Sequence, residues 1–336
     1  MSDYDPKITP WTVKADPLPA TSKVAQMAFL LRFAILAPST HNSQPWKFAI
    51  GPIGHEDISV YADWSRWLNV ADPDQREMHA SVGCALENLL VVAEHYGFAH
   101  TVTYFPKPVD ETLVASVRLV EGGAQSGHRK GLFDAIPARH TNHRRYELRM
   151  VDPHALAALQ SVVVEPEVQL FLSADDALRR RVDELVIEAD ARQFGDPEFR
   201  RELAYWIGQG AYGAPWLLAK LGEIAMRQVN PGDWMARRDA ELLLSAPVFG
   251  VISTRLNTPT HHVIAGQVYE RLHLKATALG LSMQPMNQVL QVAELKSRLS
   301  GALPIGPTAP QMIFRLGYAE PEVAHTPRRP LEEVLM

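Results

Sequence analysis

Residues 37–46 read Ala-Pro-Ser-Thr-His-Asn-Ser-Gln-Pro-Trp and place six hydrogen-bonding side chains between two prolines. Pro38 and Pro45 fix their own φ angles and lack N–H donors, so the segment is stiff and cannot continue a helix. A stiff loop of this composition is suited to holding a polar, planar ligand. The alternative is a helix-to-strand turn whose polar side chains bond only to the neighbouring backbone. The residue types alone leave both interpretations open.

A dense basic segment, Arg139-His140-Thr141-Asn142-His143-Arg144-Arg145, is the second feature with chemical potential. Arginine binds phosphate through two parallel hydrogen bonds, and small hydroxyls add donors to the same oxyanion. Because the chain has a net charge of −5, this concentration of cations favours a local phosphate or carboxylate site over a solvated face. The pair Arg328-Arg329, held between prolines, either adds to that site or is solvated.

Other patterns resemble known sites less well. Residues 208–213 read Gly-Gln-Gly-Ala-Tyr-Gly and match the dinucleotide fingerprint, but a charged helical pattern precedes them and Pro215 follows. That motif binds nucleotide only between a strand and a helix, so we interpret it as a chance match. Three pairs have metal-ligand spacing without a supporting carboxylate cluster, and we expect no metal site from them: Glu270 with His273, His140 with His143, and His261 with His262.

Composition narrows the class of protein. The chain has 336 residues, 46% of them hydrophobic and 21% charged, which is ordinary for a globular protein with a substantial core. The net negative charge argues against a general nucleic-acid binder. Cys84 is the only cysteine, which excludes an intramolecular disulfide and a cysteine-based metal site. We find no signal peptide and no membrane-spanning apolar run, and we expect a cytoplasmic protein.

Hydrophobic periodicity predicts helices and strands in two successive sets. The first set comprises helices at 22–36 and 77–96 and strands at 47–50, 58–62, 101–105 and 113–119. The second set comprises helices at 152–161 and 262–279, strands at 168–172, 247–253 and 312–316, and a mostly helical, aromatic-rich stretch at 174–245.

An internal echo suggests that the two sets arose by duplication. Five residues of the first long helix reappear in the second at a constant offset of 183: Gly83, Glu87, Leu89, Ala93 and Gly97 match Gly266, Glu270, Leu272, Ala276 and Gly280. Two such units would pair their long helices about a pseudo-two-fold axis, as a homodimer written in one chain. We therefore divide the chain into an extended arm (1–20), a first half (21–127) and a second half (128–336).

The chemical motifs resemble those of the FMN-dependent nitroreductase superfamily. Residues 38–46 closely resemble its Pro-Ser-x-x-Asn-x-Gln-Pro-Trp motif, and residues 139–144 resemble its basic motif, which holds the FMN phosphate and ribityl chain. Residues 280–287 are similar to its helix-to-strand segment beside the isoalloxazine. Residues 327–331, Pro-Arg-Arg-Pro-Leu, resemble its C-terminal arginine motif. Together these segments extend over most of the chain.

The order of the motifs differs from that of ordinary nitroreductases, in which the basic motif comes first within the same domain. Here the second half has only Glu165-Pro166-Glu167-Val168 where its own Pro-Ser motif should lie. Nothing before Pro38 resembles the basic motif. Since family dimers build each FMN site across the subunit interface, the resemblance implies one complete site per chain. The arrangement is similar to the Acg-like, double-length subgroup, in which a helical insertion covers the flavin, and we expect this lid at about 200–240.

The resemblance implies an α/β (α+β) nitroreductase-like fold of two tandem units that form a pseudo-dimer with a helical lid. It implies an FMN oxidoreductase that passes hydride from NADH or NADPH through flavin N5 to a small organic acceptor such as a nitroaromatic or a quinone. The cofactor-binding residues would be Pro38, Ser39, Asn42, Gln44, Arg139, His140, Thr141, Arg144, Asn287, Arg328 and Arg329. His41 and Tyr212 are the candidates for a general acid.

Two other functions stay open at this stage. A lid that closes fully over FMN would give a flavin-sequestering or redox-sensing protein with little turnover. The basic segment could also belong to a nucleotide-phosphate-binding module unrelated to flavin. For each of these we expect a small-molecule ligand, no nucleic acid or membrane, and a pseudo-dimeric monomer that could oligomerise further.

Overall fold

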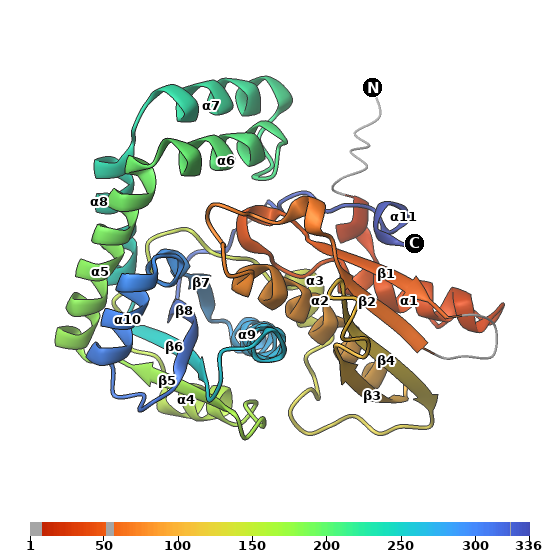
Figure 1. The fold of residues 1–336 in the computed structure, drawn as a ribbon. Helices are drawn as coiled ribbons and strands as arrows, with labels where there is room; N and C mark the ends of the chain where they lie inside the picture. The colour runs from red at the N-terminus through yellow and green to blue at the C-terminus, as the bar shows by residue number, and fades with distance from the viewer. Residues whose placement is uncertain (1–8, 52–56, 323) are drawn as a thin grey trace.

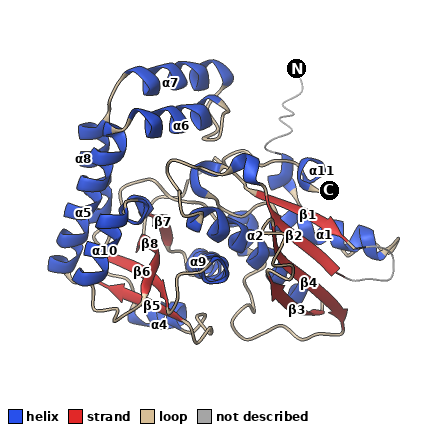
Figure 2. Ribbon diagram, in the orientation of Figure 1, coloured by secondary structure: helices blue, strands red, loops and turns tan. Residues whose placement is uncertain are grey.

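The computed structural model describes residues 9–51, 57–322 and 324–336, and it contains two four-stranded antiparallel sheets with helices around them (Figures 1 and 2). The first sheet has the order β1-β2-β4-β3 and the second the order β5-β6-β8-β7. The strands are β1 (Trp46–Ile50), β2 (Asp57–Ala62), β3 (Phe98–Tyr104), β4 (Leu113–Glu121), β5 (Val168–Ser173), β6 (Val248–Thr254), β7 (Ser282–Pro285) and β8 (Ala309–Gly317). The repeated order confirms two units of the same topology.

Two long helices, α2 (Arg76–His95) and α9 (Pro259–Ala278), pack against each other between the sheets. Both have 20 residues, and their first residues are 183 apart. A Cβ at Gly83 would overlap the carbonyl oxygen of Val263, and a Cβ at Gly266 would overlap that of Ala80. Val263 lies 183 residues after Ala80, so the two contacts are reciprocal. This geometry agrees with the pseudo-two-fold axis that the internal echo predicts.

Shorter helices flank the units. Helix α1 (Lys23–Ala34) begins after Ser22, whose side chain accepts a hydrogen bond from the Ala25 N–H, and it packs on α2. Helix α4 (Pro153–Gln160) begins after Asp152 in the same way and occupies the corresponding place before β5. The remaining short elements are η1 (Thr9–Thr12), η2 (Thr40–Asn42), η3 (Trp64–Arg66), α3 (Ala135–Ala138), η4 (Asn287–Gln291), α10 (Ala293–Ala302) and α11 (Leu331–Val334).

The second unit carries a helical insertion between β5 and β6. It consists of α5 (Asp176–Gly195), α6 (Pro197–Gly208), α7 (Trp216–Gln228) and α8 (Gly232–Ser245). Helices α5 and α8 pack together, while α6 and α7 form a hairpin that extends over the rest of the molecule (Figure 1). The fingerprint-like glycines form the turn of this hairpin, with Gly210 and Gly213 at φ +74° and +79°. A helix precedes the motif, as expected, so it is not a nucleotide-binding loop.

The C-terminal tail returns to the first unit. The N–H of Met336 donates to the carbonyl of Phe48 in β1, at 2.8 Å, and Leu335 bridges to the same strand. The tail therefore carries Arg328 and Arg329 from the second unit to the first. None of the helices in the described ranges has the length and apolar character of a membrane span.

Candidate functional site

The loop between α1 and β1 has a strained backbone. His41, Asn42 and Gln44 have φ angles of 50°, 51° and 51° in the left-handed region, where residues other than glycine are uncommon. Hydrogen bonds hold this conformation: the Gln44 N–H donates to Ser39 Oγ at 2.9 Å, and Thr40 Oγ1 donates to a Glu77 carboxylate oxygen at 2.7 Å. Such strain gathers where a fixed geometry serves function. These hydrogen bonds, together with Pro38 and Pro45, fix the conformation of the loop, as the sequence predicts.

The loop meets the C-terminal arginine motif directly. Arg328 donates to Asn42 Oδ1 at 2.8 Å, and Asn42 Nδ2 donates to the carbonyl of Pro327 at 2.9 Å. The N–H of Arg329 donates to Gln44 Oε1 at 2.7 Å, and its guanidinium lies 3.3 Å from Asp63. Two motifs nearly 290 residues apart in sequence thus form one surface.

Arg139 of the basic segment joins this surface beneath the loop. The guanidinium groups of Arg139 and Arg328 both donate to the carbonyl of Leu36, at 3.2 and 3.3 Å, directly before the Pro-Ser motif. Both side chains are buried, and the Nε atom of each has no hydrogen-bond partner. Nε of Arg139 lies 3.3 Å from the carboxylate of Glu270, which is fully buried on α9. We call Arg139, Arg328 and Glu270 the arginine cluster.

The arginine cluster has an excess of positive charge. Burial and the neighbouring Arg139 lower the pKa of Arg328, which shows that a charged guanidinium is poorly compensated there. Burial also raises the pKa of Glu270 to about 7, although Arg139 opposes the shift. Near neutral pH, two cations thus face a carboxyl group that is only partly ionised. An anionic ligand such as a phosphate group would balance this charge and would accept hydrogen bonds from the guanidinium groups.

Replacing Glu270 with glutamine is expected to flatten the pH dependence of stability. The pKa of Glu270 is about 7 in the folded chain and near 4.3 when unfolded, so the folded state retains a proton as pH rises from about 4.5 to 7. The contribution of Glu270 to the free energy of unfolding of the ligand-free protein should therefore fall by about 1 to 3 kcal/mol over that window and level off above it. Urea unfolding at several pH values measures this fall.

In Glu270→Gln the fall should be smaller, whereas replacement of the exposed Glu111 by glutamine should leave it unchanged. Equal pH dependence in the wild type and Glu270→Gln would contradict the assignment.

The pseudo-symmetric counterpart of the arginine cluster is already neutralised. Glu87 occupies the position equivalent to Glu270, and Arg129 and Arg271 each lie 2.7 Å from its carboxylate. Arg129 also contacts Glu94 at 2.9 Å, and Arg271 contacts Glu165 at 2.9 Å. Although burial acts to raise it, the two arginines hold the pKa of Glu87 well below its ordinary value. Three carboxylates thus satisfy two cations, and no anion is needed.

Glu165 lies between α4 and β5. This connection is equivalent to the one between α1 and β1 that carries the Pro-Ser motif in the first half. The Glu165 carboxylate therefore lies in the place that the missing loop would occupy. The two pseudo-equivalent regions differ in charge as well as in sequence.

Other residues of the basic segment have varied surroundings. The ring of His140 stacks on His325 at 3.9 Å, and His325 stacks on Trp11 of the N-terminal arm at the same distance. The guanidinium of Arg328 lies 4.7 Å from the ring centre of Trp11. Thr141 forms an isolated bridge with Met283 of β7. Sequence reasoning did not find Trp11 or His325, because stacking across distant segments leaves no local pattern.

Two of the predicted cofactor-binding residues, Arg144 and Asn287, make contacts outside the arginine cluster. Arg144 is largely exposed and pairs with Glu320 at 2.8 Å, so its charge is already partly balanced. Asn287 ties η4 to β8, since its Oδ1 accepts the N–H of Ile313 at 3.0 Å. Helix η4 nevertheless reaches the Pro-Ser loop, because Gln291 donates to Glu77, which also accepts from Thr40.

The turn of the α6–α7 hairpin covers the loop. The Tyr212 hydroxyl lies 2.7 Å from Nδ1 of His41, and Asn42 Nδ2 donates to the carbonyl of Ala211 at 2.8 Å. Burial lowers the pKa of His41, against the opposing effect of Glu77, and raises that of Tyr212. At neutral pH the two general-acid candidates are therefore held together in their uncharged forms.

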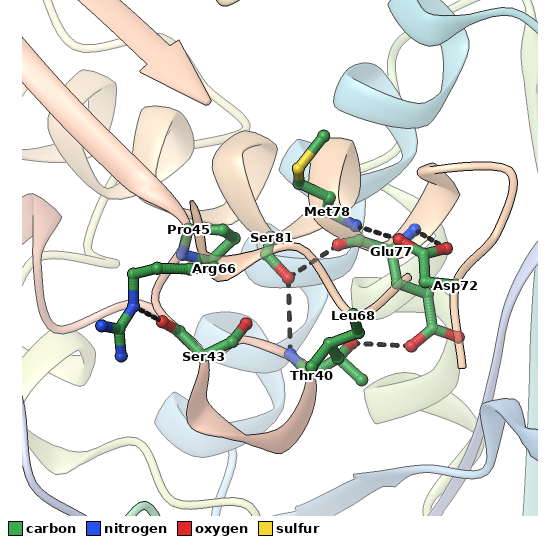
Figure 3. A pocket seen from close by; sticks show the side chains of 9 residues that line it. All are labelled: Thr40, Ser43, Pro45, Arg66, Leu68, Asp72, Glu77, Met78 and Ser81. Atoms are coloured by element: carbon green, nitrogen blue, oxygen red, sulfur yellow. Dashed lines mark hydrogen bonds between the residues drawn. The ribbon is translucent and has the colours of Figure 1, made fainter. Parts of the chain in front are cut away.

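A small pocket lies between the loop and the start of α2, as Figure 3 shows. Its side chains leave essentially no room for even a water-sized sphere, whereas typical ligand pockets have roughly 300 Å³ or more. Its lining is Thr40, Ser43, Pro45, Arg66, Leu68, Asp72, Glu77, Met78 and Ser81. A ligand with a large ring system would therefore need the hairpin turn or neighbouring side chains to move. Within the described ranges, no group of three or more His, Cys, Asp or Glu side chains is arranged to hold a metal ion.

Comparisons with known proteins agree with these observations. No protein-family model matches the chain. It is 28% identical over 324 residues to a Mycobacterium tuberculosis protein named "Putative NAD(P)H nitroreductase Rv3131", covering 91% of this chain and 90% of that protein. It is 27% identical over 324 residues to "Putative NAD(P)H nitroreductase acg" of the same species, covering 90% and 93%.

Among solved structures, a protein from Anabaena variabilis described as a "putative nitroreductase" superposes with a TM-score of 0.50 at 12% identity. The superposition covers 94% of this chain and 91% of that one, so the likeness includes both units and the insertion. The chain is therefore related over nine-tenths of its length to the Acg-like proteins named as NAD(P)H nitroreductases, and it has the nitroreductase fold.

Proposed function

We propose that the protein is an FMN-dependent oxidoreductase of the nitroreductase type, which uses NADH or NADPH to reduce a small organic acceptor such as a nitroaromatic or a quinone. The observation that carries the proposal is the arginine cluster beneath the strained Pro-Ser loop, where two buried guanidinium groups have one buried, partly ionised carboxyl group between them. The names of the relatives and the shared fold support the same activity.

The FMN phosphate is assigned to Arg139 and Arg328, with Thr141 and His140 beside them. Ser39, Asn42 and Gln44 present polar atoms of the Pro-Ser loop to the flavin ring or ribityl chain, and Pro38 fixes the start of that loop. Arg329 supports the loop by its bond to Gln44. By family resemblance, Asn287 would lie near the edge of the flavin ring. Arg144, also assigned to the phosphate by resemblance, is more exposed than Arg139.

One FMN per chain follows from the difference between the two pseudo-equivalent regions. The region around Glu87 lacks both the Pro-Ser loop and an uncompensated cation, since Glu94 and Glu165 complete its ion pairs. A phosphate group placed there would meet three carboxylates. The first-half loop and the second-half basic segment together make the single site.

When bound, FMN supplies the redox chemistry, accepting hydride at N5 from the nicotinamide and passing it to the acceptor. The chain's own residues bind the cofactor, balance its charge and exclude water. His41 and Tyr212 lie where the hairpin turn covers the loop, so either can hold a proton near a bound acceptor once the turn opens.

A flavin-sequestering protein is the second candidate, and one observation favours it. The hairpin turn bonds to the loop at both His41 and Asn42, and a cover held in this way would keep nicotinamide and acceptor out.

Anaerobic mixing of the FMN-loaded protein with NADH or NADPH distinguishes the two. We expect the flavin absorbance to bleach within seconds. Bleaching only over many minutes would favour sequestration, and Tyr212→Phe would then accelerate it about two- to tenfold by removing one hydrogen bond. A colourless protein that takes up no added FMN would contradict both readings.

A further inference from the structure

Helix α7 turns a row of large apolar side chains toward solvent. Five of them are between 53% and 73% exposed: Trp216, Leu217, Leu218, Leu221 and Ile224. Val229, directly after the end of the helix, is 58% exposed as well. Leu217, Leu221 and Ile224 follow the i, i+4, i+7 spacing of a single helix face. Small residues form the opposite face, where Ala219 is buried and Gly222 lies against Ile207 of α6. The helix thus packs inward through its small residues and presents its large ones outward.

The rest of the chain does not cover this face. Helix α6 lies between α7 and the body of the molecule (Figure 1). The inner side of α6 is itself occupied, since Leu203 and Trp206 belong to a cluster with Leu68 and Ala71. Closure of the hairpin over the Pro-Ser loop would bury α6 further and leave the outer face of α7 exposed. Contiguous apolar patches of this extent mark interaction surfaces.

We propose that the outer face of α7 docks on the same face of a second copy of this chain, with the two helices antiparallel. A two-fold axis near Gly222 and Glu223 would place Leu221 of each chain opposite the other copy's Ile224. Apolar residues thus meet apolar residues at the centre of the helix pair, and a symmetric dimer requires self-complementarity of this kind.

The size of the patch suits such a dimer. The six side chains together expose several hundred Å², approaching the ~800 Å² that each partner contributes to a standard interface. Trp234, at the start of α8 and five positions after Val229 in the sequence, is 61% exposed. Large aromatic side chains of this kind carry much of the binding energy in interfaces.

The charges on α7 favour a second copy over a lipid surface. Glu223 accepts hydrogen bonds from Lys220 at 2.8 Å and from Arg227 at 2.7 Å, so the helix keeps a surplus of only one positive charge. Helices that bind anionic membranes keep surplus cations on the polar face, and this chain has a net charge of −5. The dimer would hold each hairpin in place above its own Pro-Ser loop, and it does not depend on which ligand binds there.

Sedimentation velocity of the full chain, from low to high micromolar concentration, tests the proposal. The wild type should approach twice its monomer mass of 37.4 kDa as concentration rises. Leu221→Glu with Ile224→Glu should weaken association more than ~100-fold, because it buries carboxylates in an apolar interface. Leu148→Glu is the matched control, since Leu148 is 81% exposed outside the patch, and it should dimerise like the wild type.

Disulfide trapping gives a second readout. Cys84 is buried and is the only cysteine, so Leu221→Cys should form an intermolecular disulfide under mild oxidation and Leu148→Cys should not. A wild type that stays monomeric at every concentration would overturn the proposal, as would a double glutamate variant that still dimerises. Co-sedimentation of a monomeric wild type with phosphatidylserine vesicles would overturn it in favour of a membrane.

Discussion

Alanine in place of Arg139 or Arg328 should weaken FMN binding by about 10- to 100-fold for each variant, as expected for the loss of a charge-assisted hydrogen bond. Both guanidinium groups converge on the Leu36 carbonyl, and the buried Nε of each makes no hydrogen bond. A phosphate bound there would accept hydrogen bonds from both guanidinium groups. Fluorescence titration of the ligand-free variants with FMN measures the effect.

Arg145→Ala provides the charge-matched control, because Arg145 is an exposed member of the same basic segment. It should change FMN affinity less than about twofold in moderate salt, where exposed charges are screened. The double variant Arg139→Ala with Arg328→Ala should lose less than the product of the single effects, since neighbouring residues rarely act additively. Unchanged affinity in either single variant would refute the phosphate assignment for that residue.

The second large effect is expected at the crossing of the two central helices. Gly266→Ala should destabilise the fold by about 3 kcal/mol or more, because the added Cβ would overlap the Ala80 carbonyl oxygen and a backbone atom cannot rotate away. Gly83→Ala should have a similar effect through the reciprocal contact with Val263. Urea unfolding monitored by circular dichroism measures the change.

Gly301→Ala is the control for helix propensity alone. Gly301 also lies in a helix, but a Cβ there meets no atom within 4 Å. Its replacement should leave stability unchanged or raise it by up to about 1 kcal/mol. If Gly266→Ala is tolerated as well as Gly301→Ala, the close crossing of α2 and α9 is wrong.

Much of the fold could be predicted from the sequence, because the two duplicated units share the same pattern of residues. The 183-residue offset predicted the pairing of α2 and α9, and the structure places their matched glycines at the crossing. Helix and strand predictions were confirmed where apolar periodicity was strong, as in α1 and β8. Helix α10 was not anticipated, because its residues Ala293–Ala302 are mostly polar and only Leu295 and Leu299 are buried within it.

The site was predicted in part. The Pro-Ser loop and the arginine pair of the tail were expected to lie together, and their hydrogen bonds place them so. The role of Glu270 was missed, since its spacing to His273 suggested only an unlikely metal pair. Its partner Arg139 lies 131 positions earlier, and no local pattern can reveal a contact of that range. The ion pairs that fill the second region were hidden for the same reason.

The central claim is that one chain builds one cofactor site, and the flavin stoichiometry tests it most directly. The purified protein is saturated with FMN, freed of excess ligand, and its released flavin is compared with protein concentration from quantitative amino-acid analysis. We expect one FMN per chain, lost on combined replacement of Arg139 and Arg328. Two FMN per chain would contradict the account, because the region around Glu87 would then hold a cofactor, and no FMN would contradict the proposed function itself.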